Sequence, residues 1–311
     1  MEERLPRTRG EALVRFTLRE VLPRPWLFGP MVKLGQMLRP ILPSALADKL
    51  PPETAGAQNP WPEARAHGRR MLVLAGCVQE SLAPNINAAT ARVLDRLGIT
   101  LLTEPRAGCC GAVRFHLNDQ DGARATMRRN IDAWWPHVAA GIEGIVVTAS
   151  GCGVQVRDYG HALAADPLYR AKAERISALC RDPAEVLAAE RTRLLPVLEA
   201  LRSARGRIAV HSPCTLQHGL KLRGVMEEFL GAAGYALTPV SDGHLCCGSA
   251  GTYSVLQPEL SRRLRDDKLA ALHGGSPEVL VTANIGCLSH LQAGSALPVR
   301  HWIELIDAVL Q

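Results

Sequence analysis

Two copies of one cysteine pattern lie in this chain, and they constrain its fold more than any other feature. "AGCCGAV" at residues 107–113 and "LCCGSAG" at residues 245–251 each place two cysteines directly before a glycine. In both copies another cysteine stands 32 positions before the doubled pair, and one more follows about forty residues after it. Matched spacing of this kind predicts a duplicated domain.

Within each copy, the hydrophobic pattern alternates between strands and helices. Short apolar runs at residues 71–75 and 207–210 suit buried parallel strands, and the helical spacing after them ends at Gly98 and Gly234. Further strands are expected at "ITLLTE", "YALTPV", residues 145–149 and residues 279–283, and further helices at residues 124–140 and 257–273. The alternation predicts an α/β fold of two duplicated units, each a small, doubly wound, mostly parallel sheet.

These units divide the chain into four segments. The expected segments are a helical N-terminal part with a linker at residues 1–70, a first unit at 71–160, a helical connector at 161–206, and a second unit with a C-terminal helix at 207–311. The linker is the proline-rich stretch at residues 51–70.

The front segment is apolar and basic. Residues 14–50 carry Phe16, Trp26 and other large apolar side chains, interrupted by prolines and interspersed with arginine. These helices either pack onto the sheet of the first unit or form a surface for a partner protein or the inner face of the membrane. The prolines interrupt any long helix that could lie on a membrane, so a partner protein is the favoured occupant.

In this topology every repeated cysteine follows a strand. The carboxyl ends of parallel strands form the crevice where open α/β sheets bind ligands, so the thiols of each unit are expected to converge there. The eight candidate ligands are Cys77, Cys109, Cys110 and Cys152 in the first unit, and Cys214, Cys246, Cys247 and Cys287 in the second.

Composition narrows the setting of these thiols. The chain has nine cysteines, no apolar run long enough to cross a membrane, and charges where a signal peptide would need apolar residues. We therefore expect a reducing cytoplasm, where clustered thiols are more often metal ligands or redox groups than disulfides. The net charge of +6 is concentrated near the N-terminus, but no nucleic-acid-binding motif accompanies it.

Four soft thiolates per unit suit zinc or an iron–sulfur cluster. Structural zinc sites usually gather CxxC knuckles, and thiol–disulfide enzymes usually open a helix with CxxC; neither arrangement is present here. The ninth cysteine, Cys180, falls outside the repeat, and its surroundings predict an amphipathic helix with a buried structural thiol.

The motifs are also recognisable as a set. "AGCCGAV", "TASGCG", "PCTLQH", "GHLCCGSAGTY", "VTANIGC" and "VRHWIE" resemble the cysteine-rich CCG domains of heterodisulfide reductase and its relatives. Together with "NINAATARVLDRLGI" they are most similar to the family of iron–sulfur subunits of bacterial glycolate oxidase. The resemblance covers the chain from about residue 5.

The resemblance implies an oxidoreductase complex in which a flavin subunit oxidises glycolate to glyoxylate. This chain would bind a [4Fe–4S] cluster in each unit and carry electrons towards the respiratory chain, in the cytoplasm or peripherally on the inner membrane. No flavin or nucleotide fingerprint occurs, so no substrate site of its own is predicted.

Two departures from the family pattern carry predictions. Members of the family ordinarily start with a ferredoxin-like region, whereas no cysteine precedes Cys77 here. The expected explanations are a truncated form, a fragment, or a chain whose partner is a separate ferredoxin-like module. Relatives often end each repeat with CxxC, and Ala149 and Asn284 replace the first cysteine of those pairs. Four cysteines per unit suit a cubane cluster better than a noncubane one.

Two other interpretations stay open. One is a redox protein of the heterodisulfide reductase or lactate-utilisation type, with thiol or disulfide chemistry at the second site. His211, His218 and His244 flank that site in the sequence and could supply protons. The other is a zinc scaffold without redox activity.

Overall fold

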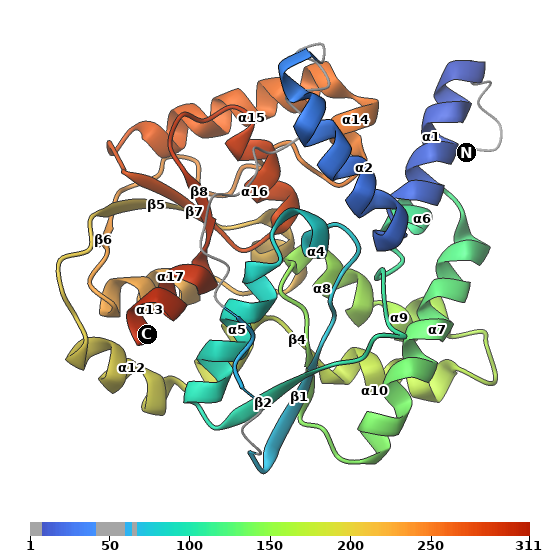
Figure 1. The fold of residues 1–311 in the computed structure, drawn as a ribbon, viewed down its shortest axis with the longest axis horizontal. Coiled ribbons are helices and arrows are strands. Elements are labelled where there is room, and N and C mark those ends of the chain that lie inside the picture. The colour runs from blue at the N-terminus through green and yellow to red at the C-terminus, as the bar shows by residue number, and fades with distance from the viewer. Residues whose placement is uncertain (1–7, 42–59, 64–66) are drawn as a thin grey trace.

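The computed structural model describes residues 8–41, 60–63 and 67–311. Most of the predicted linker at residues 51–70, and the end of the apolar segment at 14–50, lie outside the described residues. The rest folds into two four-stranded parallel sheets, each with helices on both faces (Figure 1). The predicted α/β class with two repeated units is therefore confirmed.

Both sheets have the same strand order. In each, the second strand lies at one edge, followed by the first, the third and the fourth. The first sheet consists of β1 (Arg69–Val73), β2 (Ile99–Thr103), β3 (Gly144–Val146) and β4 (Cys180–Arg181). The second consists of β5 (Arg207–His211), β6 (Ala236–Leu237), β7 (Val279–Thr282) and β8 (Val299–His301).

The fourth strand of each sheet corrects the sequence-based topology, which had three strands per unit. β4 pairs with β3, with Cys180 opposite Ile145, and β8 pairs with β7, with Val299 opposite Leu280. Cys180 therefore lies in a strand, and the prediction that it lies on a helix is wrong. The segment at residues 161–206 is not only a connector, because it completes the first sheet.

The repeat continues beyond these strands into matched helices. α11 (Pro183–Ala189) follows β4, and α17 (Trp302–Leu310) follows β8. Each begins with a capping box, in which Asp182 or His301 accepts a backbone N–H and a glutamate three residues later bonds back to the cap. The division into four segments stays a prediction, but residues 180–189 clearly repeat residues 299–310.

The remaining helices connect and cover the strands. They are α1 (Arg9–Val21), α2 (Pro25–Leu38) and the short turn η2 (Arg39–Ile41) at the front; α4 (Gln79–Leu82), α5 (Asn85–Arg96), α6 (Ala112–His116), α7 (Gln120–Ala139), α8 (Ser150–Arg157), α9 (Tyr159–Ala162), α10 (Arg170–Leu179) and α12 (Arg191–Ala200) around the first sheet; and η3 (Thr215–Gly219), α13 (Val225–Ala232), α14 (Tyr253–Leu256), α15 (Pro258–His273) and α16 (Ile285–Gln292) around the second.

One hydrophobic core joins the two sheets. Along β1, Met71 and Val73 face this shared core, whereas Leu72 and Leu74 face a second core under α7 and α10. Strands buried on both faces need such continuous apolar runs. The shared core contains α5, α11, α12, α13 and α17. Within it α5 packs against α17 (Figure 1), and α13 packs against α11.

The front helices lie on the carboxyl-end side of the first sheet. α2 packs against α4, and α1 packs against α6, so their contacts are chiefly with the helices that follow β1 and β2. α1 has no buried residue and α2 has only Val32. Among the described residues, no helix is both long and apolar enough to cross a bilayer.

Candidate metal centre

In each unit the structure brings four cysteines to the carboxyl ends of the strands. Cys77 follows β1, the Cys109–Cys110 pair follows β2, and Cys152 lies in the first turn of α8, directly after β3. The second unit repeats this placement. Cys214 precedes η3 after β5, Cys246 and Cys247 follow β6, and Cys287 lies in the first turn of α16.

The first four thiols form a connected chain of contacts. Cys109 lies in hydrogen-bond contact with both Cys77 and Cys110, and the Sγ atoms of Cys110 and Cys152 are 3.2 Å apart. Cys77, Cys109 and Cys110 are buried and Cys152 is half-buried; all four are free thiols. We refer to these four residues as the first site.

The second site repeats the same order. Cys246 contacts Cys214 and Cys247, and Cys247 contacts Cys287. Cys247 and Cys287 are buried, whereas Cys214 and Cys246 are half-buried. Each predicted ligand is therefore brought together with the other three of its unit.

The close packing of the thiols separates their pKa values. Hydrogen bonds from Cys110 and Cys77, helped by the backbone N–H of Gly111, hold the pKa of Cys109 well below its usual range. The same contacts, together with burial, raise the pKa values of Cys77 and Cys110. Four thiols at such distances repel one another once they are ionised, so a bound cation is what would let all four become thiolates.

A glycine shapes each doubled pair. Gly111 and Gly248 adopt φ values of +95° and +83°, which side chains other than glycine rarely tolerate. This conformation directs the N–H of Gly111 to Cys109 Sγ at 3.5 Å, and that of Gly248 to Cys246 Sγ at 3.3 Å. The CCG sequence therefore provides two ligands and one hydrogen-bond donor to sulfur from a single turn.

Side chains from other elements hold the first loop in place, and the sequence analysis did not identify them. Asn130 on α7 accepts from the backbone N–H of Gly108 and donates to the carbonyl of Cys109. The hydroxyl of Tyr159 donates to the carbonyl of Cys110 at 2.8 Å. In the second unit, Ser261 donates to the carbonyl of Gly248 at 2.7 Å. The only sequence signal for these three residues is the helical periodicity that places them on the same helix face as the residues packed against the CCG turns.

Of the three candidate histidines, one lies against the thiols of the second site and the other two do not. His211, at the end of β5, lies with Cys247 and Cys287 in a group whose nitrogen and sulfur atoms are within 4.8 Å of one another. His218 and His244 have exposed side chains. Asn284, three residues before Cys287, donates to Cys287 Sγ at 3.5 Å.

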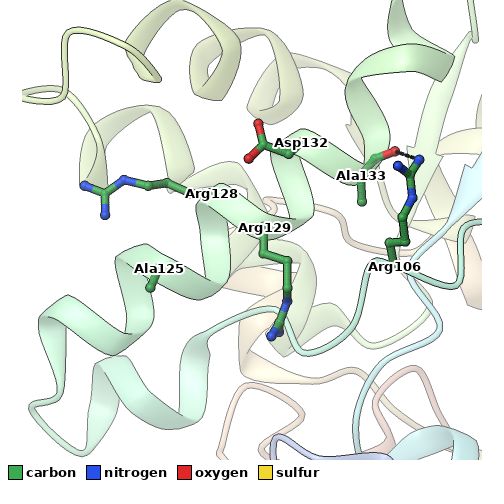
Figure 2. A pocket seen from close by; sticks show the side chains of 6 residues that line it. All are labelled: Arg106, Ala125, Arg128, Arg129, Asp132 and Ala133. Carbon is green, nitrogen blue, oxygen red and sulfur yellow. Dashed lines mark hydrogen bonds between the residues drawn. The ribbon is translucent and has the colours of Figure 1, made fainter.

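A shallow pocket of about 450 Å³ lies beside the first site, and no cysteine lines it. Arg106, Arg128 and Arg129 surround it, together with Asp132 and two alanines (Figure 2). Arg106 and Arg128 are paired with Glu104 and Asp166. This is an exposed basic surface near the first site and not a part of the candidate metal centre.

The repeated thiol sites define the class of the protein. The CCG family, described as "Cysteine-rich domain", matches residues 71–157 and 208–292, which together make up more than half of the chain. The chain belongs to this family, as the predicted resemblance indicated.

Within this family, similarity over the full length groups the chain with the glycolate oxidase iron–sulfur subunits. The chain is 50% identical over 311 residues, covering 100% of its length and 75% of the relative's, to the "Glycolate oxidase iron-sulfur subunit" of Escherichia coli (strain K12).

More distant relatives cover the repeats. The chain is 26% identical over 227 residues (73% of this chain, 50% of the relative) to the "Probable glycolate oxidase iron-sulfur subunit" of Bacillus subtilis (strain 168). It is 29% identical over 219 residues (69% of this chain, 87% of the relative) to "Lactate utilization protein A" of Bacillus velezensis (strain DSM 23117 / BGSC 10A6 / LMG 26770 / FZB42).

Proposed function

We propose that this chain is the iron–sulfur electron-transfer subunit of a glycolate oxidase, with a [4Fe–4S] cluster held by the four thiols of each site. The observation that carries the proposal is the same connected chain of four free thiols in both units, Cys77–Cys109–Cys110–Cys152 and Cys214–Cys246–Cys247–Cys287. Four thiolates are the usual ligand set of such a cluster.

The residues around the thiols suit this cofactor. A bound cluster would supply one-electron oxidation and reduction without a change of ligands. The N–H groups of Gly111 and Gly248 would donate to its thiolate sulfurs, which stabilises the more negative, reduced state. Burial of Cys109, Cys110 and Cys247 would keep water from the cluster.

Electrons would come from the flavin-containing subunits that oxidise glycolate to glyoxylate, with a ferredoxin-like module as a further partner. They would leave towards the respiratory chain. We place the complex in the cytoplasm, at most peripherally on the inner membrane.

The exposed face of α1 and α2 supports a docking site for the flavin subunit. Leu13, Phe16, Trp26 and Met37 are each more than half exposed, an unusual density of large apolar side chains. Salt bridges tie this face to the first site, because Glu20 on α1 pairs at 3.1 Å with an arginine of α6, the helix directly after the CCG turn. A partner bound there would lie close to the first site.

The metal assignment is tested by the iron and acid-labile sulfide content of protein purified without oxygen. We expect brown protein with broad absorption near ~400 nm, which bleaches when the flavin subunit and glycolate are added. Colourless protein that binds zinc, and holds no sulfide after anaerobic reconstitution, would overturn the proposal.

The docking site is tested by binding of the flavin subunit to the Phe16→Ser/Trp26→Ser double variant. We expect weaker binding with unchanged iron content, because both side chains are exposed. The matched control is Leu168→Ser, which removes a 79% exposed apolar side chain from the loop before α10. Equal affinity of the two variants would exclude this face.

One observation favours the heterodisulfide reductase type of chemistry as a second candidate. Cys214 and Cys246 are only half-buried, so a disulfide substrate could reach the second site. Turnover of small disulfides by the chain alone, without the flavin subunit, would support this alternative. Its absence in protein with both clusters would leave the electron-transfer function.

A further inference from the structure

The two sites share their thiols but differ at the positions around them. Counted from the cysteines, Leu74 corresponds to His211, three residues before the first ligand of each unit. Ala149 corresponds to Asn284, three residues before the last ligand. The first site therefore has two apolar side chains where the second has two side chains with N–H groups.

His211 is a buried imidazole that lies against thiols. It is 2% exposed, and within the described chain neither ring nitrogen forms a hydrogen bond of normal geometry. Leaving such a group unsatisfied in a protein interior is costly. Its position within 4.8 Å of the sulfurs of Cys247 and Cys287, together with its side-chain contact to Cys287, indicates that its partner is a thiolate sulfur or the group that these thiolates bind.

A third matched position adds a positive charge. Ala123 on α7 and Ser261 on α15 are matched positions, because the carbonyl of each faces the glycine of its own CCG turn. Seven residues after these positions, α7 has Asn130 whereas α15 has Lys268. Lys268 is 2% exposed, and its ammonium donates to the carbonyl of Asp242 at 2.8 Å. Burial lowers the pKa of Lys268, and the charges of the Cys247 thiolate and Asp242 oppose that shift.

The first site has a nearby cation too, but in a different environment. Arg129 lies beside the first CCG loop and adds to the thiol contacts that lower the pKa of Cys109, yet it is exposed at the edge of the shallow pocket (Figure 2). Water and salt screen an exposed charge far more than a buried one. The charge of Lys268 at the second site is therefore screened less than that of Arg129 at the first.

Residues next to the two sites also contact each other. Ser150, two residues before Cys152, shares a 2.7 Å hydrogen bond between hydroxyls with Thr215, the residue after Cys214. The backbone N–H of Ser150 also meets the carbonyl of Ala283 at 3.4 Å. The ligands of the two units are thus linked through short covalent and hydrogen-bonded paths.

We propose that His211 and Lys268 make the second site the electron acceptor of the pair, so that electrons enter at the first site and pass to the second. This rests on the proposed iron–sulfur function. An imidazole N–H directed at sulfur and a buried ammonium both stabilise the added negative charge of a reduced cluster.

The transfer makes and breaks no bond. One electron leaves the first site, which is oxidised by one electron, and the second site is reduced by one electron. A reduced flavin of the partner supplies the electron, and a quinone-type acceptor removes it.

The experiment is an anaerobic redox titration of the full chain, followed by electron paramagnetic resonance. Cys110→Ser and Cys247→Ser identify which signal belongs to which site. We expect the second site to have the higher midpoint potential. His211→Leu and Lys268→Asn, which install the residues of the first site, should each lower the midpoint of the second site and leave the first unchanged.

Three results overturn the inference while leaving the proposed function intact. These are equal midpoints, a higher midpoint at the first site, or no shift of the second site in a fully loaded Lys268→Asn variant. That variant is decisive if His211→Leu fails to fold or loses its cluster. Protein without acid-labile sulfide would instead overturn the proposed function, so the two failures are distinguishable.

Discussion

The first and second sites carry the same chain of four thiols at different depths. Cys109 is 1% exposed, whereas its counterpart Cys246 is half-buried, and Cys77 and Cys214 differ in the same way. α2 packs on α4 beyond Cys77, and α1 packs on α6 beyond the first CCG turn. These front helices are not part of the repeat, so equal ligand sets have acquired unequal surroundings.

The largest expected effect is the loss of one site at a time. Cys110→Ser should remove about half of the iron and acid-labile sulfide, and Cys247→Ser the other half, because each site needs four thiolates. The measurement is iron and sulfide per chain after anaerobic reconstitution.

The control for these variants is Cys180→Ser, which should keep both clusters. Cys180 corresponds to Val299, and burial raises its pKa to about 12. Loss of a full cluster from this variant would contradict the ligand assignment.

The second prediction asks whether the two halves unfold separately. Arg92 on α5 pairs at 2.6 Å with Asp307 on α17, across the shared core, and both side chains are largely buried. Arg92→Met leaves a buried carboxylate without its partner, which should cost about 3–5 kcal/mol. Denaturant unfolding should stay a single transition at a lower midpoint.

The matched control is Arg191→Met, which breaks an exposed pair with Glu228 between α12 and α13 and should cost less than about 1 kcal/mol. Two separate unfolding transitions in the wild-type protein would show that the shared core does not couple the halves.

The third prediction uses the matched caps of α11 and α17, which respond to pH in opposite directions. Burial raises the pKa of Asp182 to about 7 from 3.8. Between about pH 4 and pH 7 the carboxyl is therefore protonated in the folded state but ionised in the unfolded state, so stability falls as the pH rises through this range. Burial lowers the pKa of His301 to about 4 from 6.5. Between about pH 6.5 and pH 4 the imidazole is therefore neutral in the folded state but protonated in the unfolded state, so stability falls as the pH drops through this range.

Variants with asparagine, itself a good cap, separate the two effects. Asp182→Asn should raise the free energy of unfolding at pH ~8 by roughly 4 kcal/mol, and have little effect below pH ~4. His301→Asn should remove part of the destabilisation at acidic pH. The Nδ1 atom of His301 accepts from Ile303 and its Nε2 atom donates to Thr148 of the first half, so its protonation would break the cap. Identical pH profiles for both variants would contradict these assignments.

The smallest expected effect is the difference in stability between two glycine substitutions, one in each CCG turn. A Cβ on Gly111 would lie 3.5 Å from the carbonyl oxygen of Ala123, whereas a Cβ on Gly248 would collide with the carbonyl oxygen of Ser261. Gly111→Ala should therefore cost only the left-handed backbone penalty of about 1–2 kcal/mol. Gly248→Ala should cost about 1 kcal/mol more, as measured by thermal unfolding. An equal cost would mean that the second turn can relax.

Most of the features that recur at matched spacing in the two units were predictable from the sequence. Cysteine spacing and apolar runs located three strands per unit and all eight thiols, because ligands after parallel strands must meet at one edge of the sheet. The fourth strands escaped prediction because β4 is only two residues long and directly follows the helical periodicity of α10.

The differences between the sites could not be predicted in the same way. His211 flanks the second site in the sequence, but so do His218 and His244, and only the fold distinguishes the one that reaches the thiols. Lys268 lies 21 residues after Cys247, and only the packing of α15 under the second CCG turn brings the two together.

The crossed packing of α5 on α17, and of α11 on α13, has a consequence for how the two halves assemble. The helix after the fourth strand of each half packs on the long helix that follows the first strand of the other half, as matched elements do across a two-fold axis. A chain with a single repeat would leave these apolar faces exposed and would need a second copy of itself to cover them. Joining the two repeats in one chain makes this packing intramolecular, so its assembly does not depend on protein concentration. It also lets the two copies of the candidate metal site differ in sequence.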